Sequence, residues 1–222
     1  MFYVKSTKGI KRLSQSERRT IFLPNNIEEA LVGIMLSDGH IQRRSLTANG
    51  RFIFYQSGKI EKRPYFELVY NLFKVYCTKN YEFHLKTWID KNTNQEYSSI
   101  SFATMQLPYF TKIYSLWYKN GKKRVPFDIK ESLTPLGLAH WIMGDGSRHN
   151  LGLHLSVYAF SYEEVEILID ILKTKFNFKC SVHKLSSIGN KPRIYIWEES
   201  MVKLRLLVSP FIIPSMLYKI QK

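Results

Sequence analysis

The sequence is poor in the residues that build zinc sites. Its 222 residues include two cysteines, Cys77 and Cys180, which form no Cys-x-x-Cys pair, and this argues against a cysteine zinc site. The six histidines contain no His-x-His or His-Glu-x-x-His spacing, so a histidine zinc site is disfavoured as well. We expect both cysteines to be small buried residues of a protein kept in a reducing compartment.

Long hydrophobic runs and acidic residues are also scarce. No apolar run reaches the roughly 18 residues of a membrane span, so we expect a soluble chain with no membrane partner. Acidic residues number 18 against 33 basic ones, which gives a net charge of +15 and a pI of about 9.7. Such a charge favours a polyanionic partner, with nucleic acid as the first choice. An anionic membrane surface is the weaker alternative, because no basic amphipathic helix stands out.

What the chain does have is an internal repeat. Leu31-Val-Gly-Ile-Met-Leu-Ser-Asp38-Gly39 and Leu138-Ala-His-Trp-Ile-Met-Gly-Asp145-Gly146 lie 107 positions apart. Each is an apolar run of helical length that ends in a small residue, an Asp and a Gly. An isolated Asp-Gly usually marks a turn or helix end, but two copies behind one apolar pattern indicate two copies of one site.

Small residues in the repeat predict a close helix pair. Gly33, Ser37, Ala139 and Gly144 would let the two helices approach each other, which would bring both Asp residues near a common axis. Ordinary core packing is the alternative explanation, and both can hold together. A length of 222 residues with 45% hydrophobic residues suits one large domain or two small similar halves.

The two Asp residues suit metal-assisted phosphodiester hydrolysis. That reaction needs an activated water, charge neutralisation and a stabilised leaving oxygen, and a divalent metal can supply all three. Mg²⁺ prefers oxygen ligands and keeps several waters, so one or two carboxylates suffice. Asp38 and Asp145 each fall near a helix C-terminus, where the carbonyls of Ser37 and Gly144 could add ligands and the helix dipole favours a cation.

The pattern along the chain divides it into an N-terminal basic arm at 1–24 and two halves at 25–126 and 127–222. Each half is predicted to contain a helix, two strands, a helix, two strands and one or two helices. Expected strands include 40–48, 51–56 and 151–158, and a helix over 108–119 is expected to stop at Asn120-Gly121. Residues 1–16 are basic and contain no acid, which is compatible with a transit peptide or with a DNA-contacting arm.

The repeated segments resemble the LAGLIDADG motif, and the chain resembles a monomeric, double-motif LAGLIDADG homing endonuclease. The resemblance runs from about Asn25 to Lys219. Within the family, the chain is similar to the yeast mitochondrial branch that includes the omega intron endonuclease. Three further stretches carry it: Leu133-Thr-Pro135-Leu-Gly-Leu-Ala-His-Trp-Ile-Met, Phe160-Ser-Tyr-Glu-Glu-Val-Glu166 and Ile213-Pro-Ser-Met-Leu-Tyr-Lys219. The chain departs from the motif at His140, where the family usually has Gly, and this puts the helix contact there in question.

The resemblance implies an α+β fold of two pseudo-symmetric αββαββα halves whose antiparallel sheets form a DNA-binding saddle over the major groove. It also implies that the motif helices form the interface and that Asp38 and Asp145 bind Mg²⁺ or Mn²⁺. Each site would cut one strand across the minor groove, leaving short 3′ overhangs and 5′-phosphates. The family places a basic residue beside each metal, and Lys123 and Lys219 match best, with Lys122 able to replace Lys123.

Residues on the strands are candidates for reading DNA bases. Arg and Lys suit guanine and Asn and Gln suit adenine, although each alone is more often a phosphate contact or a solvated side chain. Gln56 is also a weaker candidate for positioning water. The candidates are Gln42, Arg44, Arg51, Gln56, Lys86, Trp88, Arg148, His154, Lys184 and Arg193.

Three other functions compete with the endonuclease. An intron-encoded RNA maturase would bind intron RNA without cutting, a DNA-binding regulator could use the same scaffold, and a basic ribosomal or architectural protein would need no acidic helix tips. Both motif acids are present, which favours the nuclease. We expect a double-stranded DNA target of roughly 20 base pairs, and a residue usage typical of an AT-rich gene weakly favours a mitochondrion or another organelle.

Overall fold

The computed structural model describes residues 13–78, 83–185 and 191–221. Two successive sets of elements have the same order. The first set is α2 (Asn25–Leu36), β1 (Gly39–Gln42), β2 (Arg51–Ser57), α3 (Arg63–Phe73), β3 (His84–Ile89), β4 (Glu96–Ala103) and α4 (Pro108–Trp117). The second set is α6 (Pro135–Asp145), β7 (Gly146–His149), β8 (Gly152–Ser156), α7 (Tyr162–Thr174), β9 (Cys180–Leu185), β10 (Lys191–Ile196) and α8 (Glu198–Val208).

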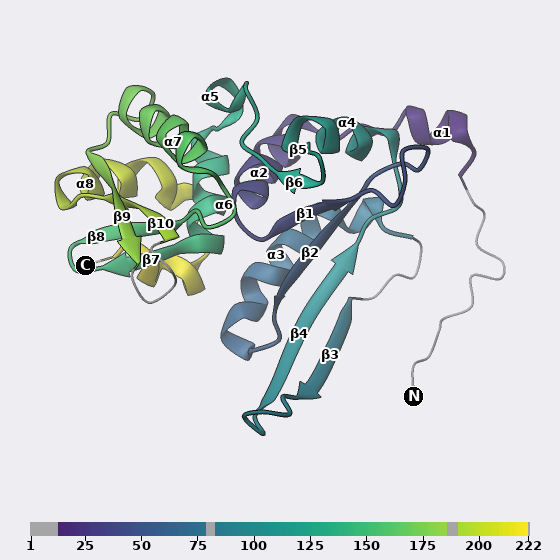
Figure 1. Ribbon diagram of the computed structural model, residues 1–222, viewed down its shortest axis with the longest axis horizontal. Coiled ribbons are helices and arrows are strands. Elements are labelled where there is room, and N and C mark those ends of the chain that lie inside the picture. The colour runs from purple at the N-terminus through teal and green to yellow at the C-terminus, as the bar shows by residue number, and fades with distance from the viewer. Residues whose placement is uncertain (1–12, 79–82, 186–190, 222) are drawn as a thin grey trace.

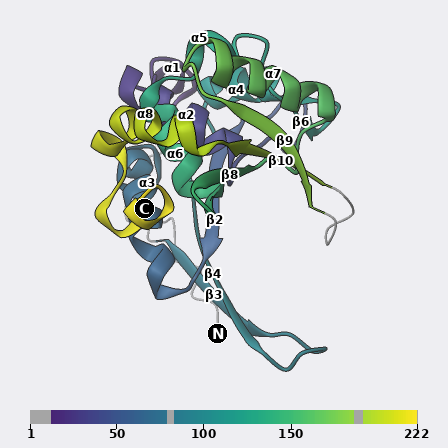
Figure 2. The same ribbon diagram turned by 90° about the vertical axis from the view of Figure 1, so that its left-hand side faces the viewer.

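Each set builds one antiparallel sheet of four strands. The strand order is β1-β2-β4-β3 in the first sheet and β7-β8-β10-β9 in the second. In Figure 1 the first sheet lies on the right, the second on the left, and α2 and α6 stand between them. Figure 2 shows the β3–β4 and β9–β10 hairpins extending away from these helices on the same side of the molecule. The predicted α+β fold with a two-sheet saddle is confirmed.

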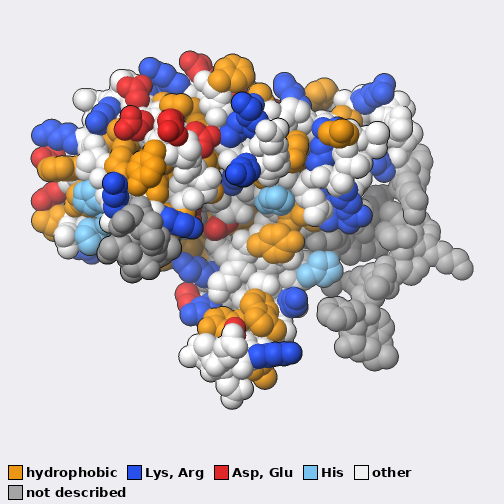
Figure 3. Space-filling view, in the orientation of Figure 1, with side chains coloured by type: hydrophobic (Ala, Val, Ile, Leu, Met, Phe, Trp, Pro, Cys, Tyr) orange, Lys and Arg blue, Asp and Glu red, His pale blue; other side chains and the backbone are white. Residues whose placement is uncertain are grey.

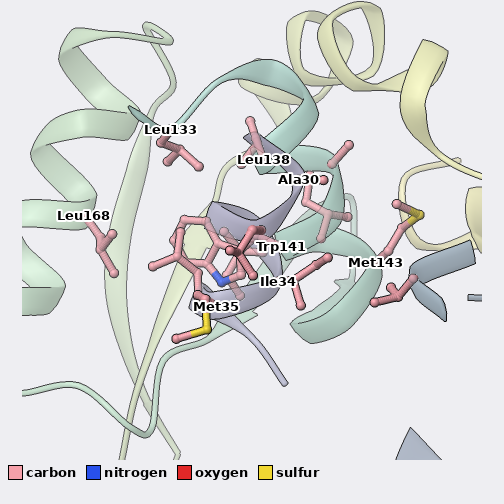
Figure 4. Close-up of a cluster of buried hydrophobic side chains, with 14 of the residues drawn as sticks. Ala30, Ile34, Met35, Leu133, Leu138, Trp141, Met143 and Leu168 are labelled. Atoms are coloured by element: carbon pink, nitrogen blue, oxygen red, sulfur yellow. The ribbon is translucent and has the colours of Figure 1, made fainter. Parts of the chain in front are cut away.

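The helix pair α2 and α6 is in close contact, as the repeat predicted. A Cβ atom added to Gly33 would lie 1.7 Å from the Gly137 carbonyl oxygen, and one added to Gly144 would lie 2.4 Å from Ser37 Oγ. Glycine therefore lets the two backbones meet at Gly33, and it leaves room for the Ser37 side chain at Gly144. Ala139 is buried, but Gly137, which the sequence did not single out, provides the contact opposite Gly33. Figure 4 shows apolar side chains of both helices packed around this contact.

The unexpected His140 does not disturb the pair, because it is directed toward α3. Its Nδ1 lies 3.3 Å from the Tyr65 hydroxyl, which also donates to the His140 carbonyl oxygen at 3.0 Å. Both side chains are buried, and burial lowers the pKa of His140 to about 4. The imidazole is therefore a neutral, hydrogen-bonded core residue.

Local signals explain where the helices begin. Thr134 caps α6 by accepting from the Gly137 amide, and Ser161 forms a complete capping box with Glu164 at the start of α7.

Phenylalanines fill the core between the first sheet and its helices, including Phe52 and Phe73 with ring centroids 4.5 Å apart. Cys77 and Cys180 are free and buried, as predicted. Across the described ranges, no helix has the length and apolar character to cross a bilayer.

Several predicted boundaries were wrong. The strand expected over 40–48 ends at Gln42, because the following residues fold into a polar loop in which Arg43 Nε donates to the Ala48 carbonyl. Asn120-Gly121 does not stop a helix but forms the turn between β5 (Tyr118–Lys119) and β6 (Lys122–Lys123), both residues having positive φ.

Other short elements were missed altogether. Two strands were expected after the first helix of the second half, but β7 was given no residue range, since its sequence carries no apolar alternation and three of its four residues are exposed. The helices α1 (Gln15–Arg19) and α5 (Ile129–Ser132) were also missed, and α1 falls inside the segment expected to be an arm. The described residues also form the short 3₁₀ segments η1 (Ile60–Lys62), η2 (Lys74–Tyr76), η4 (Ser209–Phe211) and η5 (Pro214–Lys219). Residues 1–12 of the expected arm lie outside the described residues.

Candidate active site at the ends of the paired helices

The two repeated Asp residues come together because their helices do. Asp38 follows the C-cap residue of α2, and Asp145 is the last residue of α6. A Cβ atom placed on Gly144, next to Asp145, would lie 3.9 Å from Asp38 Oδ2. Extending the strand registers by one residue sets Asp38 opposite Tyr55 and Asp145 opposite Ser156. Each acid therefore directly precedes the first strand of its sheet, which begins at Gly39 in β1 and at Gly146 in β7.

The surroundings of this acid pair disfavour the charged carboxylates. Burial, and then the neighbouring Asp38, raise the pKa of Asp145 to about 7 against the opposing effect of Lys123 and Lys219. Burial also raises the pKa of Asp38, while the same lysines and Lys62 lower it. Both side chains still reach solvent, although protein atoms replace part of the water around each acid. A cation arriving there would relieve the unfavourable charge.

Each lysine proposed from the sequence binds the end of one motif helix. Lys123 Nζ donates to the carbonyl oxygens of Ser37 at 3.1 Å and Gly39 at 2.8 Å. Lys219, which is only 3% exposed, donates to Met143 at 2.6 Å and Gly144 at 3.1 Å, and to Ile142. An ammonium at a helix C-terminus pairs with unsatisfied carbonyls and with the negative end of the helix dipole.

Burial also perturbs these two lysines. It lowers the pKa of Lys123 and of Lys219 to about 8, even though both acids favour the charged form. Lys219 is further affected by Lys62, a third cation near the acid pair. Lys62 ends η1 before α3 and was missed from the sequence, because nothing in its local pattern distinguishes it from a solvated lysine. Lys122 is exposed on β6, whereas Lys123 makes the carbonyl contacts.

The donor set fits a hard divalent cation that keeps part of its water shell. Asp38 and Asp145 offer carboxylate oxygens, and across the described ranges no cluster of three or more His, Cys, Asp and Glu could form a complete cage. Mg²⁺ commonly binds one or two carboxylates together with water and phosphate. The carbonyls of Ser37 and Gly144, named as further ligands, already accept from lysines, so a metal there would use their remaining lone pairs.

The strand registers divide the base-reading candidates between the two faces of each sheet. Alternation puts the Phe52 and Phe54 side against the helices, so the opposite face is the one open to DNA. Six candidates lie on that open face: Gln42, Arg51, Lys86, Trp88, His154 and Arg193. Arg51 Nε donates to Gln42 Oε1 at 2.9 Å, and Lys86 lies over the Trp88 ring. Arg44 is exposed in the loop after β1.

Three candidates are on the helix side instead. Lys184 pairs with buried Pro192 and extends over the Tyr162 ring of α7, and Arg148 pairs with buried Leu153 near the tip of its hairpin. Gln56 shares the side of Phe54, and its buried Oε1 lacks a hydrogen-bond partner within the described part of the chain. Extending the β1–β2 register places Gln56 opposite Ser37, at the acid pair's end of the sheet. These positions do not suit base reading.

Fold and site together define a duplicated α+β protein with one acid and one lysine from each half at a shared centre. The family model for the LAGLIDADG DNA endonuclease family matches residues 28–204. The chain belongs to this family, as the two motifs indicated.

Relatives of this chain carry two kinds of name. Cytochrome b mRNA maturase bI2 of Saccharomyces cerevisiae is 34% identical over 99% of this chain, which spans only 54% of that protein's length. Intron-encoded endonuclease ai4 of Dictyostelium discoideum is 34% identical over 69% of this chain and 98% of its own length.

Solved structures repeat the architecture. The homing endonuclease I-WcaI bound to its DNA recognition sequence matches with a TM-score of 0.84 and 27% identity, covering 96% of both chains. An I-DmoI variant in complex with its target DNA in the presence of Mn matches with a TM-score of 0.52 and 10% identity over 83% of this chain, which shows the shared fold.

Proposed function

We propose that this protein is a site-specific homing endonuclease that makes metal-dependent double-strand breaks in a long DNA target. The observation that carries the proposal is the acid pair Asp38 and Asp145, held at the junction of two open sheet faces by a glycine contact between α2 and α6. The chain's membership in a DNA endonuclease family and its likeness to a DNA-bound homing endonuclease support the proposal.

The two sheets bind the DNA, and the two motif acids carry out the cleavage. Their open faces carry Arg51, Lys86 and Arg193, which suit phosphates or guanine edges, and a net charge of +15 attracts the duplex. Each motif acid faces one strand of the duplex, so one chain cuts both strands as a monomer and leaves short 3′ overhangs. The target is roughly 20 base pairs long.

Asp38 and Asp145 would hold the metal, for which Mg²⁺ is our first choice and Mn²⁺ the second. A bound divalent cation supplies a water of lowered pKa and neutralises charge on the phosphate. Lys123 and Lys219 position the ends of α2 and α6 and add positive potential beside the phosphate. Burial lowers the pKa of both lysines to about 8, so their positive charge beside the phosphate decreases as pH rises through that value.

A maturase is the second candidate function, since a maturase is 34% identical over nearly the whole chain. In that case the protein would bind intron RNA and assist splicing, and the acids would be dispensable. The names of the relatives also favour a mitochondrion or another organelle as its location.

The deciding experiment is cleavage of a pooled duplex library with Mg²⁺, with EDTA, and by the Asp145→Asn variant. Asp170→Asn is the matched control, because Asp170 is an exposed carboxylate on α7. We expect cuts at one long site that require both metal and Asp145 and that survive in the control. Binding to intron RNA with no cut in Mg²⁺ or Mn²⁺ would replace the endonuclease by the maturase.

A further inference from the structure

The open face of the second sheet carries three histidines, of which His154 contacts both of the others. His154 Nε2 and His183 Nδ1 are 3.2 Å apart, and the His149 ring stacks on His154 with centroids separated by 4.3 Å. Tyr195 packs against the same rings, with its centroid 4.6 Å from His183 and 5.0 Å from His154. His154 is buried behind the others, whereas His149 is exposed and His183 is half-buried. The two outer imidazoles are therefore the ones presented to a ligand on this face.

The hydrogen bond between His154 and His183 limits what the cluster can offer. Of two neutral imidazoles, one donates and the other accepts across the 3.2 Å contact. Each neutral ring has a single N–H, so the pair has only one further N–H outside this bond. An added proton would convert one ring into an imidazolium, strengthen the internal hydrogen bond and give the pair a second N–H outside it.

The sheet itself provides no counter-charge for that proton. β7, β8, β9 and β10 contain no Asp or Glu, and the charged neighbours on the open face are cations. Arg193, the register partner of His183, binds the Tyr158 hydroxyl, and Lys191 lies over the Tyr158 ring. Burial, and then His149, His183 and Arg193, lower the pKa of His154 to about 4. The remaining neighbours on this face are Tyr195 and the hydroxyls of Ser147, Ser156 and Ser181.

A DNA duplex reverses this balance, because its phosphates supply the missing negative charge. Guanine and adenine edges also present acceptors that suit an N–H donor. We propose that the imidazole cluster of His149, His154 and His183 is a proton-linked DNA contact, which takes up one proton from the buffer when the second half binds its part of the target. The inference rests on the proposed DNA-binding function and deepens it by assigning His149 and His183 to the contact.

The first sheet offers a matched comparison. His84 faces Ser101 there, as His183 faces Arg193 in the second sheet, but Ile53 occupies the register position of His154. The buried imidazole that links the cluster is thus replaced by an apolar side chain. His84→Asn is therefore a control for removing one histidine from the equivalent place.

The test measures the affinity of the selected target duplex by fluorescence anisotropy from pH 6 to pH 8 at constant salt. Asp145→Asn in EDTA serves as the parent, so that neither strand of the duplex is cut and Asp145 does not titrate. One proton taken up makes binding up to about tenfold tighter for each pH unit lowered. We expect His149→Asn with His183→Asn to flatten this pH dependence, and His84→Asn to preserve it.

Proton uptake is also measured directly, by titration calorimetry of the parent in buffers of different ionisation enthalpy at pH 7. Uptake of about one proton, lost in the double variant, is expected. An unchanged pH dependence in the double variant, an equal loss of affinity at every pH, or no proton uptake would each overturn the inference and leave DNA binding intact. Absence of specific binding by the parent at any pH would overturn the proposed function, and this inference with it.

Discussion

Replacing Asp145 by Asn is expected to destroy double-strand cleavage and yet stabilise the metal-free protein. The pKa of Asp145 is about 7 in the folded protein against an ordinary value of 3.8, so folding disfavours the charged carboxylate. That difference corresponds to roughly 4 kcal/mol as an upper limit. Solvent and salt reduce it, because the side chain is partly exposed, and we expect a gain of about 1–2 kcal/mol at pH 8.

The gain should depend on pH in a defined direction. Below pH 4 the carboxyl is protonated in both states, and Asn changes little. Between about pH 4 and pH 7 the unfolded chain has released a proton that the folded chain retains, so the stability of the parent falls as pH rises. Above pH 7 the carboxyl is ionised in both states, and the full advantage of Asn remains.

Urea denaturation in EDTA at pH 4 and pH 8 checks this reasoning, with Asp170→Asn as the exposed-carboxylate control. For a chain of 222 residues the gain corresponds to a rise in melting temperature of about 2–8 °C. An Asp145→Asn variant that is less stable than the parent at pH 8, or equally stabilised at both pH values, would refute the electrostatic account of the site.

Three further predictions concern packing and capping. Gly33→Ala should cost at least about 2–3 kcal/mol in urea denaturation, since its Cβ would overlap a backbone carbonyl; Gly121→Ala, at φ 75° with no neighbouring atom within 4 Å, should cost only about 1 kcal/mol. Lys219→Met should cost about 1–3 kcal/mol and more than Lys123→Met, because Lys219 is more buried and donates to three carbonyls rather than two; equal losses would contradict that order. Ser161→Ala should lower stability by about 1 kcal/mol through loss of the α7 cap, while specific cleavage, measured in parallel, stays unchanged.

The paired helices could be predicted from the sequence because their signal is local and repeated. An apolar run, a small residue and Asp-Gly recur in both halves, and the closeness of Asp38 to Asp145 follows from helix packing. The identity of the contact residues does not follow, because the offset between two helices is a tertiary property. Gly137 was accordingly missed, and so was the turn of His140 toward Tyr65.

Assignments on the strands were harder, since they depend on register and on alternation. A shift of one residue exchanges the two faces of a strand, and Lys184 and Gln56 lie on the helix side for this reason. Lys62 belongs to the site because the fold places it close enough to Asp38 to lower the pKa of that carboxyl. The histidine cluster escaped notice because its members come from three strands.

The asymmetry of the helix contact bears on how such a chain can be rearranged by evolution or by protein engineers. The repeat equates Gly33 of the first half with His140 of the second. In a homodimer of two second halves joined by the same helix contact, His140 would therefore stand where even a single added carbon lies 1.7 Å from a carbonyl oxygen. The second half can therefore form this helix contact with the first half but not with a second copy of itself. A symmetric enzyme made from it, recognising a palindromic target, requires a small residue at position 140 before any change to the DNA-reading strands.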